Sequence, residues 1–319
     1  MAGVAVIINP GSGRGNGKGA ALRDALTGLA GVHVTFLSSF ELLEPALAEI
    51  ARKDVRMIFI SSGDGTIQAI QSFIAEGGHF ARPPQLCILP HGTTNMTAAD
   101  LGFQRRSIAE QAAFIANPDP QQITERRAIR VLDAADGRVR QGMFLGTGAV
   151  AQATRQCQTS FNDQGVRGNL AAFAIMAQAA AKALFLPANP DDARRIDRPA
   201  DISCDIDGQH LCDGPQLTVM ATTLHRLVLN AKPFWGGENG AIRATSFSYP
   251  LPRLLLRWIL PAIMGGEERR PPPGANSISG AAGIIKTMEE FVIDGEFFRP
   301  PASGLVRFET GQNFSYITA

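Results

Sequence analysis

The sequence predicts an N-terminal doubly wound α/β domain followed by a mainly antiparallel β-sandwich domain. In the first third of the chain, strand-like apolar runs alternate with helix-like segments, which is typical of a parallel sheet covered by helices. After about residue 125, short apolar runs separated by turns follow one another, which is typical of a sandwich or barrel. We therefore expect an α/β domain at residues 1–125 and a β-sandwich domain at residues 126–319, whose last residues could rejoin the first domain.

The spacing of apolar residues defines the elements of the first domain in order. We expect strands at Val4–Ile8, Val32–Leu37, Val55–Ile60 and Gln85–Leu89, alternating with helices at Ala20–Leu29, Glu41–Ala51 and Ile67–Ile74. Ligands of such sheets bind beyond the carboxyl ends of the strands. The glycine-rich segments that follow the first, third and fourth of these strands are therefore candidates to line one crevice.

The second domain shows short apolar runs with turn residues between them. We expect strands at Ile129–Leu132, Met143–Leu145, Ile202–Ile206, Gln209–Cys212, Gln216–Ala221, Ile242–Phe247, Gly283–Thr287, Glu290–Ile293 and Leu305–Phe308. Two segments, Asn169–Phe185 and Pro252–Met264, have the spacing of helices. This order of elements indicates antiparallel pairing, in contrast to the first domain.

The composition is that of a chain with a large apolar core and few charges. The 319 residues are 45% hydrophobic and 18% charged, and the formal net charge is +1. Nucleic-acid-binding proteins usually carry a basic excess, so the charge argues against that class. The sequence contains no apolar run of transmembrane length and begins without a secretory leader. We therefore expect neither a transmembrane helix nor export.

The four cysteines lack a metal-binding spacing. Cys204 and Cys212 flank the dipeptide Asp207–Gly208, a strong signal for a two-residue hairpin turn. If Ile206 faces Gln209 across this turn, the two thiols lie on opposite faces of the hairpin, which argues against a disulfide. We therefore expect reduced cysteines and a cytoplasmic protein.

The most informative segment is the turn after the strand Val55–Ile60, which reads Ser-Ser-Gly-Asp-Gly-Thr over residues 61–66. A strand, a glycine turn and a helix start form an anion cradle, because backbone N–H groups and the positive end of the helix dipole point at the ligand. Glycine also lets a phosphate approach closely. A carboxylate at this place repels phosphate unless it handles Mg²⁺ or takes a proton. Asp64 therefore predicts nucleotide chemistry rather than simple anion binding.

A second glycine-rich segment, Gly11–Gly19, follows the first strand and the dipeptide Asn9–Pro10. It matches neither the P-loop pattern nor the pattern G-x-G-x-x-G. It is either a flexible surface loop or a loop that contacts phosphate, with Arg14 or Lys18 as the cation. Its place between a strand and a helix favours the second interpretation.

Two further motifs each have an ordinary structural interpretation. The segment Leu89–Asn95 ends a strand in a glycine turn with hydroxyl and amide side chains, which are also common in plain turns and helix caps. Asp294, Gly295 and Glu296 follow the strand Glu290–Ile293 and first of all indicate a hairpin turn. However, carboxylates two residues apart on an extended segment share a face, which suits a base and its metal or water partner.

In their order and spacing, these four motifs resemble the family of ATP-dependent lipid kinases that comprises diacylglycerol, sphingosine and ceramide kinases, in its bacterial type. The resemblance covers nearly the whole chain, including the change from alternating strands and helices to mainly strands. It implies a lipid kinase that uses ATP and Mg²⁺ and acts on a lipid substrate at a membrane surface. It further implies a cytoplasmic enzyme peripheral to the inner face of the membrane.

The resemblance also assigns roles to individual residues. The nucleotide-binding residues that it implies are Asn9, Pro10, Ser12, Gly13, Arg14, Ser62, Gly63, Asp64, Gly65, Thr66, Gly92, Thr93 and Asn95. The family places the general base on either of two carboxylates, here Asp294 or Asp64. We favour Asp294 as the base, with Glu296 supporting it and Asp64 organising Mg·ATP and the acceptor hydroxyl. Mg²⁺ is expected to arrive with ATP, without a firm set of protein ligands.

Departures from the family pattern indicate the substrate. Gln152 stands where sphingosine kinases place an aspartate near the substrate amine, and a glutamine cannot neutralise an ammonium group. This favours a lipid without a free amine, ceramide or diacylglycerol, over a sphingoid base.

The segment Glu238–Gly240 replaces the acidic loop that holds a structural Mg²⁺ in bacterial diacylglycerol kinases, which argues against that metal. Arg155 and Arg167 lie where sphingosine kinases supply arginines to the phosphates.

Three alternatives stay open. Leu251–Arg270 carries a tryptophan, leucines and arginines, and is either an amphipathic segment at the membrane interface or a helix that covers the core. The chain could instead be a soluble kinase of NAD or sugars, because related folds share the turn around Asp64. A non-catalytic binding protein is the third alternative, suggested by the altered pair Gln68 and Ala69 after that turn.

Overall fold

The computed structural model describes residues 3–93, 95–102, 106–118, 122–164, 196, 198–250 and 271–318. The chain forms two compact units, one comprising Met1–Arg127 and Gln312–Ala319 and the other Ala128–Gly311. It passes from one unit to the other within strand β5 (Ile123–Val131) and again within strand β17 (Leu305–Ile317).

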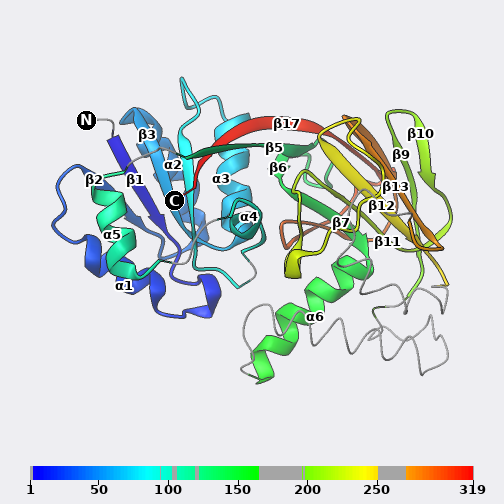
Figure 1. Ribbon diagram of the computed structural model, residues 1–319, viewed down its shortest axis with the longest axis horizontal. Coiled ribbons are helices and arrows are strands. Elements are labelled where there is room, and N and C mark those ends of the chain that lie inside the picture. Colours follow the sequence, from blue (N-terminus) through cyan, green and yellow to red (C-terminus); the bar gives the residue numbers. More distant parts are fainter. Residues whose placement is uncertain are drawn as a thin grey trace. The chain divides into compact units, whose positions relative to one another are not determined.

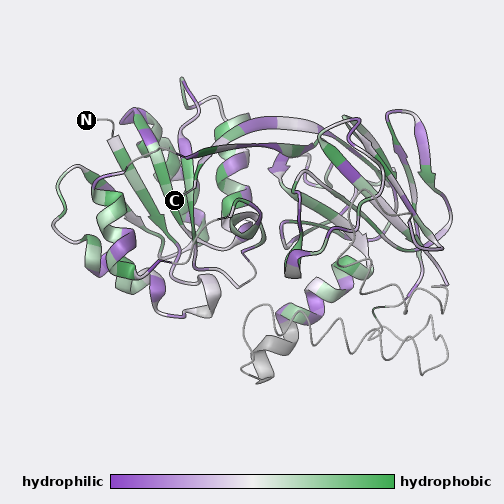
Figure 2. Cartoon of the chain, viewed as in Figure 1, coloured by the Kyte–Doolittle hydropathy of each residue, from purple (hydrophilic) through white to green (hydrophobic). Residues whose placement is uncertain are grey.

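The first unit is built on a parallel sheet (Figure 1). Its strands are β1 (Gly3–Ile8), β2 (Val32–Phe36), β3 (Val55–Ser62) and β4 (Gln85–Pro90), in the order β4–β3–β1–β2. The carboxyl-terminal end of β17 lies parallel to β4, with Tyr316 opposite Leu86. Because β1 and β3 are central, most of their residues are apolar, on both faces of the sheet, as Figure 2 shows.

Helices cover both faces of this sheet. They are α1 (Lys18–Leu26), α2 (Leu43–Arg52), α3 (Asp64–Glu76), α4 (Met96–Asp100) and α5 (Ile108–Ala116), with short 3₁₀ turns η1 (Ser12–Arg14) and η2 (Phe40–Leu42). Leu22 of α1 and Ile115 of α5 pack against alternate residues of β1, such as Val6. Helix α5 begins at a capping box formed by Ser107 and Glu110.

The second unit contains two antiparallel layers around one core. One sheet has the order β13–β12–β11–β7–β15–β16, with β8 beside β11, and the other layer contains β10, β9, β14 and β17 in that order and the pair β5 and β6. Their bounds are β6 Arg140–Gly142, β7 Phe144–Gly148, β8 Ala200–Asp201, β9 Ser203–Ile206, β10 Gln209–Cys212, β11 Pro215–Thr222, β12 Ile242–Ser248, β13 Ala275–Gly280, β14 Ala282–Lys286, β15 Phe291–Ile293 and β16 Glu296–Phe298. Apolar residues of both layers, such as Val219 and Phe308, share one cluster. This is the sandwich architecture.

The predicted fold class is confirmed, with differences in individual elements. Helices α4 and α5 and the short strands β6 and β8 were not expected. Helix α6 (Ala149–Gln164) and strand β13 were not expected either, because their sequences are polar and lack a clear apolar period. The 3₁₀ turn η3 (Val228–Asn230) is a further addition. The expected helices Asn169–Phe185 and Pro252–Met264 lie outside the described residues. Among the helices that are described, none combines the length and the apolar character needed to cross a bilayer.

The expected register of the β9–β10 hairpin is wrong. Ile206 does pair with Gln209, but the register shifts after His210, so that Cys212 lies opposite Cys204. Leu211 is therefore the extra residue of a bulge, which the two-residue periodicity of the sequence cannot reveal. The cysteines are nevertheless free. Burial raises the pKa of Cys212 to about 11 and that of Cys204 well above its usual range.

Candidate active site

The loop after β1 and the turn after β3 are joined by side-chain hydrogen bonds. Asn9 donates from Nδ2 to Oγ1 of Thr66 at 3.0 Å. The hydroxyl oxygen of Ser12 lies 2.7 Å from that of Ser62 and accepts a hydrogen bond from the backbone N–H of Gly63 at 3.0 Å. Because β1 and β3 are neighbouring parallel strands, their carboxyl ends place these side chains together.

The turn after β4 packs against the same loops through its glycines. A Cβ atom on Gly92 would lie 2.4 Å from the Cα atom of Gly63, so the two backbones meet where no side chain fits. Gly13 has a φ of +58°, and a Cβ there would lie 2.4 Å from the carbonyl oxygen of His91. Asn95 closes the turn, accepting from Gly92 N–H and donating to Gly92 C=O, both at 2.8 Å. The structure thus brings all three predicted turns together.

Asp64 occupies the first position of α3, and its carboxylate is held by the start of another helix. Oδ2 accepts from the backbone N–H of Met96 at 3.1 Å and Oδ1 from that of Thr97 at 3.3 Å, both in the first turn of α4. Desolvation by burial raises the pKa of Asp64, and these backbone hydrogen bonds oppose the rise because they favour the charged form. The carboxylate therefore sits in a place that disfavours its charge unless a cation joins it.

The other predicted nucleotide residues border the same turns. Pro10 follows Asn9, and Gly65 lies in the first turn of α3, whose leading N–H groups have no acceptor inside the helix. Thr93 lies in the turn that Asn95 closes and is partly buried. Arg14 ends η1, and its side chain lies outside the described part of the structure.

His91 is a member of this cluster that the sequence did not single out. Its Nδ1 lies 2.8 Å from the hydroxyl oxygen of Ser61, and its carbonyl oxygen accepts from Asn16 Nδ2 at 3.0 Å. Burial, assisted by the charge of Lys18, lowers the pKa of His91 to about 4, so the imidazole is neutral at pH 7. A single histidine forms no spacing pattern that a sequence could reveal. Only its position next to Gly92 could have indicated that His91 belongs to this cluster.

Asp294 belongs to the second unit and lies in the turn between β15 and β16. Its backbone is left-handed, with a φ of +48°, and its side chain is buried. The two carboxylate oxygens accept from the backbone N–H groups of Met143 and Phe144, each at 2.9 Å. The two-residue turn places Ile293 opposite Glu296.

The expectation that Asp294 and Glu296 share one face is wrong. It assumed an extended segment, whereas Asp294 and Gly295 both have positive φ and form the turn itself. Asp294 is therefore buried while Glu296 is exposed at the start of β16. Desolvation of its carboxyl still raises the pKa of Glu296.

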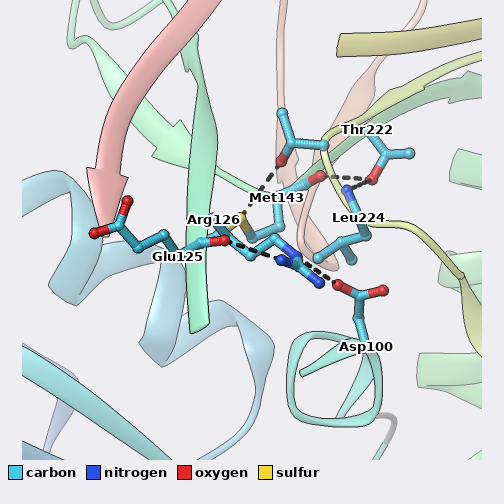
Figure 3. Close-up of polar contacts among 7 residues, drawn as sticks. Asp100, Glu125, Arg126, Met143, Thr222 and Leu224 are labelled. Carbon is cyan, nitrogen blue, oxygen red and sulfur yellow. Dashed lines mark hydrogen bonds and ion pairs between the residues drawn. The ribbon is translucent and has the colours of Figure 1, made fainter. Parts of the chain in front are cut away.

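The peptide group between Met143 and Phe144, whose N–H holds Asp294, is itself held at its carbonyl oxygen by Thr222 and Thr223. Met143 lies between β6 and β7, and its carbonyl oxygen accepts from Thr222 Oγ1 at 2.7 Å and from the N–H of Thr223 at 3.2 Å. Figure 3 shows the contact of Met143 with Thr222, whose hydroxyl also accepts from Leu224 N–H at 3.1 Å. This support for Asp294 was not predicted, because the partners are far apart in sequence.

Helix α6 contacts the same hairpin. Arg155 forms an ion pair with Glu290 and lies over the ring of Phe297, 4.4 Å from its centroid. Gln158 donates to the carbonyl oxygen of Gly295 at 3.0 Å. Arg155 is thus partnered by a carboxylate, while the second expected phosphate arginine, Arg167, lies outside the described residues.

Two departures from the family pattern also have visible partners. Gln152 accepts from Arg198 Nε at 3.5 Å, so a cation lies beside it. Glu238 pairs with Arg243 at 3.3 Å, and the described residues contain no cluster of acidic, histidine or cysteine side chains suited to a metal ion.

Comparison with known proteins relates the first unit to a known catalytic domain and the whole chain to solved structures. Residues 3–126 match the model of the diacylglycerol kinase catalytic domain. The fold resembles the crystal structure of "a putative diacylglycerol kinase" from Bacillus anthracis str. Sterne, with a TM-score of 0.67 and 18% identity over 99% of this chain and 97% of that one. A second structure, of a diacylglycerol kinase from the same organism, gives a TM-score of 0.61 and 16% identity over the same shares.

No protein with a curated description matches the sequence. At identities below 20% the structural likeness speaks for the fold, while the family model matches the unit that contains the three glycine turns. Residues 3–126 thus match the diacylglycerol kinase catalytic domain, and the whole chain shares the fold of these two bacterial structures.

Proposed function

We propose that the enzyme transfers the γ-phosphate of Mg·ATP to the hydroxyl of a lipid without a free amine, either ceramide or diacylglycerol. The observation that carries this proposal is the joining of three glycine turns around Asp64 in the first unit. Such turns offer backbone N–H groups to phosphate oxygens without side chains in the way.

The residues present fit a nucleotide with its metal. The contact of Gly63 with Gly92 leaves bare backbone at the ends of two strands, and the first turn of α3 directs its N–H groups outward. Burial raises the pKa of Asp64, and a divalent cation nearby would favour the charged form of this carboxylate. Mg·ATP, when bound, supplies the phosphoryl group and neutralises its charge. Lys18 and Arg14 are the proposed cations of the loop.

Asp294 is the proposed general base. Its carboxylate would accept the proton of the lipid hydroxyl while the hydroxyl oxygen bonds to the γ-phosphorus and the bond from that phosphorus to the bridging oxygen of ADP breaks. Two backbone N–H groups orient this carboxylate, so its position costs no reorganisation during the reaction. Glu296 is proposed to support it through its nearby charge.

The contact between Gln152 and Arg198 supports an acceptor without an amine. A guanidinium group at this place would repel the ammonium of a sphingoid base, which glutamine cannot offset. We further propose that the lipid is taken from a membrane surface to which the protein binds peripherally. The segment considered for this contact, Leu251–Arg270, lies outside the described residues.

The test is an assay with labelled ATP and Mg²⁺ against ceramide, diacylglycerol and sphingosine, each in phosphatidylcholine vesicles, and against NAD in solution. We expect label in ceramide or diacylglycerol. Labelling of sphingosine alone would make the chain a sphingoid-base kinase, and labelling of NAD alone would refute a lipid substrate. If every acceptor stays unlabelled while Mg·ATP binds, the chain is a nucleotide-binding protein without this activity.

A further inference from the structure

We propose that the buried ion pair between Asp100 and Arg126 is a positioning device for Asp64, acting through helix α4. This inference rests on the proposed function, because it concerns the binding of Mg·ATP by Asp64. Both residues of the pair lie in the first unit and neither belongs to a glycine turn.

Helix α4 connects the pair to Asp64 directly. Its first two residues, Met96 and Thr97, donate the N–H groups that hold the Asp64 carboxylate. Its last residue is Asp100, whose carboxylate accepts from Arg126 Nε at 3.0 Å. Figure 3 shows Arg126 reaching from β5 to this end of the helix. The five-residue helix is thus held at one end by Asp64 and at the other by the ion pair.

A helix this short depends on such contacts for its position. Helices well below about 12 residues are not stable by themselves, and α4 has five residues. The hydrogen bonds to Asp64, at 3.1 and 3.3 Å, already lie at the long end of the usual range. A small shift of α4 would therefore break them and free the carboxylate to turn.

The ion pair has the burial that a fixed anchor needs. The Asp100 side chain is 0% exposed and that of Arg126 is 20% exposed. Arg126 also donates from Nη1 to the carbonyl oxygen of Glu125 at 2.9 Å, which fixes its guanidinium on its own strand. By contrast, the pair between Arg307 and Asp133 in the second unit has a guanidinium that is 60% exposed, so it provides a control of the same chemistry.

The experiment measures the binding of Mg·ATP by titration calorimetry and the KM values for Mg·ATP and for the lipid, in full-length variants whose thermal midpoint is recorded. Arg126→Gln removes the guanidinium group and with it the ion pair to Asp100. We expect its Kd and KM for Mg·ATP to rise about tenfold, with the KM for lipid unchanged, because a displacement on the order of 1 Å can cost up to about 100-fold in rate. Arg126→Lys should recover part of the loss, and Asp133→Asn should leave both nucleotide constants unchanged.

The competing interpretation is that the pair only stabilises the fold. It would be right, and the inference wrong, if Arg126→Gln lowered the thermal midpoint but left the Kd and KM for Mg·ATP within about twofold of the wild type. If Arg126→Gln does not fold, Asp100→Asn carries the same test, because the Arg126 side chain reaches solvent. A wild-type protein that binds no Mg·ATP would refute the proposed function instead, before any variant is compared.

Discussion

The two carboxylates proposed for the reaction, Asp64 and Asp294, are held by the same kind of bond in two different frames. Each accepts from the backbone N–H groups of two successive residues. For Asp64 these groups belong to the free first turn of helix α4, where N–H groups lack partners by geometry. For Asp294 they belong to Met143 and Phe144, at the junction of strands β6 and β7.

The difference suggests that Asp294 has a role in the stability of the fold and that Asp64 does not. The Asp294 side chain is buried and satisfies amides of the sandwich core, so the fold needs it regardless of catalysis. Asp64 is partly buried in a place that raises its pKa, so its charge costs folding free energy. A carboxylate whose charge lowers the stability of the fold, placed at the end of a strand, indicates a role in binding or catalysis. Substitutions at the two positions should separate these duties.

The largest effect is expected for Asp294→Asn, which removes the base and one acceptor. We expect kcat to fall by about 100-fold or more and the free energy of unfolding to fall by about 1–3 kcal/mol, because an amide nitrogen would face a backbone N–H. Asparagine tolerates the left-handed backbone of this turn, so the change is electronic rather than steric. Steady-state kinetics and urea unfolding measure the two effects.

Glu296→Gln is the matched control on the same hairpin. Glu296 is exposed and begins β16, so we expect a loss of kcat of only a few-fold, about 2- to 5-fold, and no change in stability. Near-normal turnover of Asp294→Asn would move the base to Asp64 and leave Asp294 with a structural duty alone.

Asp64→Asn should reduce kcat by a similar factor of about 100 without loss of stability. Because the folded pKa of Asp64 is raised, folding stability falls as pH rises from its ordinary pKa of 3.8 through the folded value. At pH 7 the asparagine variant escapes this penalty, which offsets the loss of one acceptor for the N–H groups of Met96 and Thr97, so its thermal midpoint should equal or exceed that of the wild type. The added stabilisation by Mg·ATP should disappear. A clear drop in the midpoint without nucleotide would show that Asp64, like Asp294, is needed by the fold.

The sequence could predict features that depend on residues close together in the chain, and it could not predict contacts between residues far apart in the chain. Strand and helix periods are local, and glycine turns at strand ends identified the cluster around Asp64 from the order of elements. The clamp on Asp294 joins residues 150 and 151 positions apart, and no local pattern encodes such a partner. The bulge at Leu211 shifts the hairpin register by a single residue, and the positive φ of Asp294 makes a turn where an extended segment was expected. A two-residue period shows neither.

The contact of Gly92 with Gly63 offers a finer test within the first unit. A Cβ on Gly92 would lie 2.4 Å from Gly63 Cα, whereas a Cβ on Gly63 would lie 3.5 Å from Gly92 Cα, an ordinary contact. Gly92→Ala should therefore cost about 1–3 kcal/mol of stability as the turns separate and weaken Mg·ATP binding about tenfold.

Gly63→Ala should preserve stability, because its φ of −97° suits alanine. If phosphate approaches this backbone, the added methyl group should still weaken Mg·ATP binding, which calorimetry can measure. Unchanged binding in Gly63→Ala would show that phosphate does not approach the backbone at this glycine.

The last effect is confined to acidic pH and concerns His91, whose imidazole contacts the Ser61 hydroxyl and whose backbone carbonyl accepts from Asn16. Its pKa falls from 6.5 to about 4 on folding, so the unfolded chain binds a proton in this window and the folded chain does not. Stability is therefore unaffected above about pH 6.5 and falls as pH decreases towards 4, by about 3 kcal/mol at most.

His91→Asn keeps a polar atom near Ser61 but does not titrate, so its unfolding free energy should change less between pH 7 and 4 than that of the wild type. Equal acid responses in the two proteins would mean that His91 takes up its proton in the folded state. The hydrogen bond from Asn16 to the His91 carbonyl would then be the contact that joins the turn after β4 to the loop after β1, since a backbone acceptor does not depend on the charge of the ring.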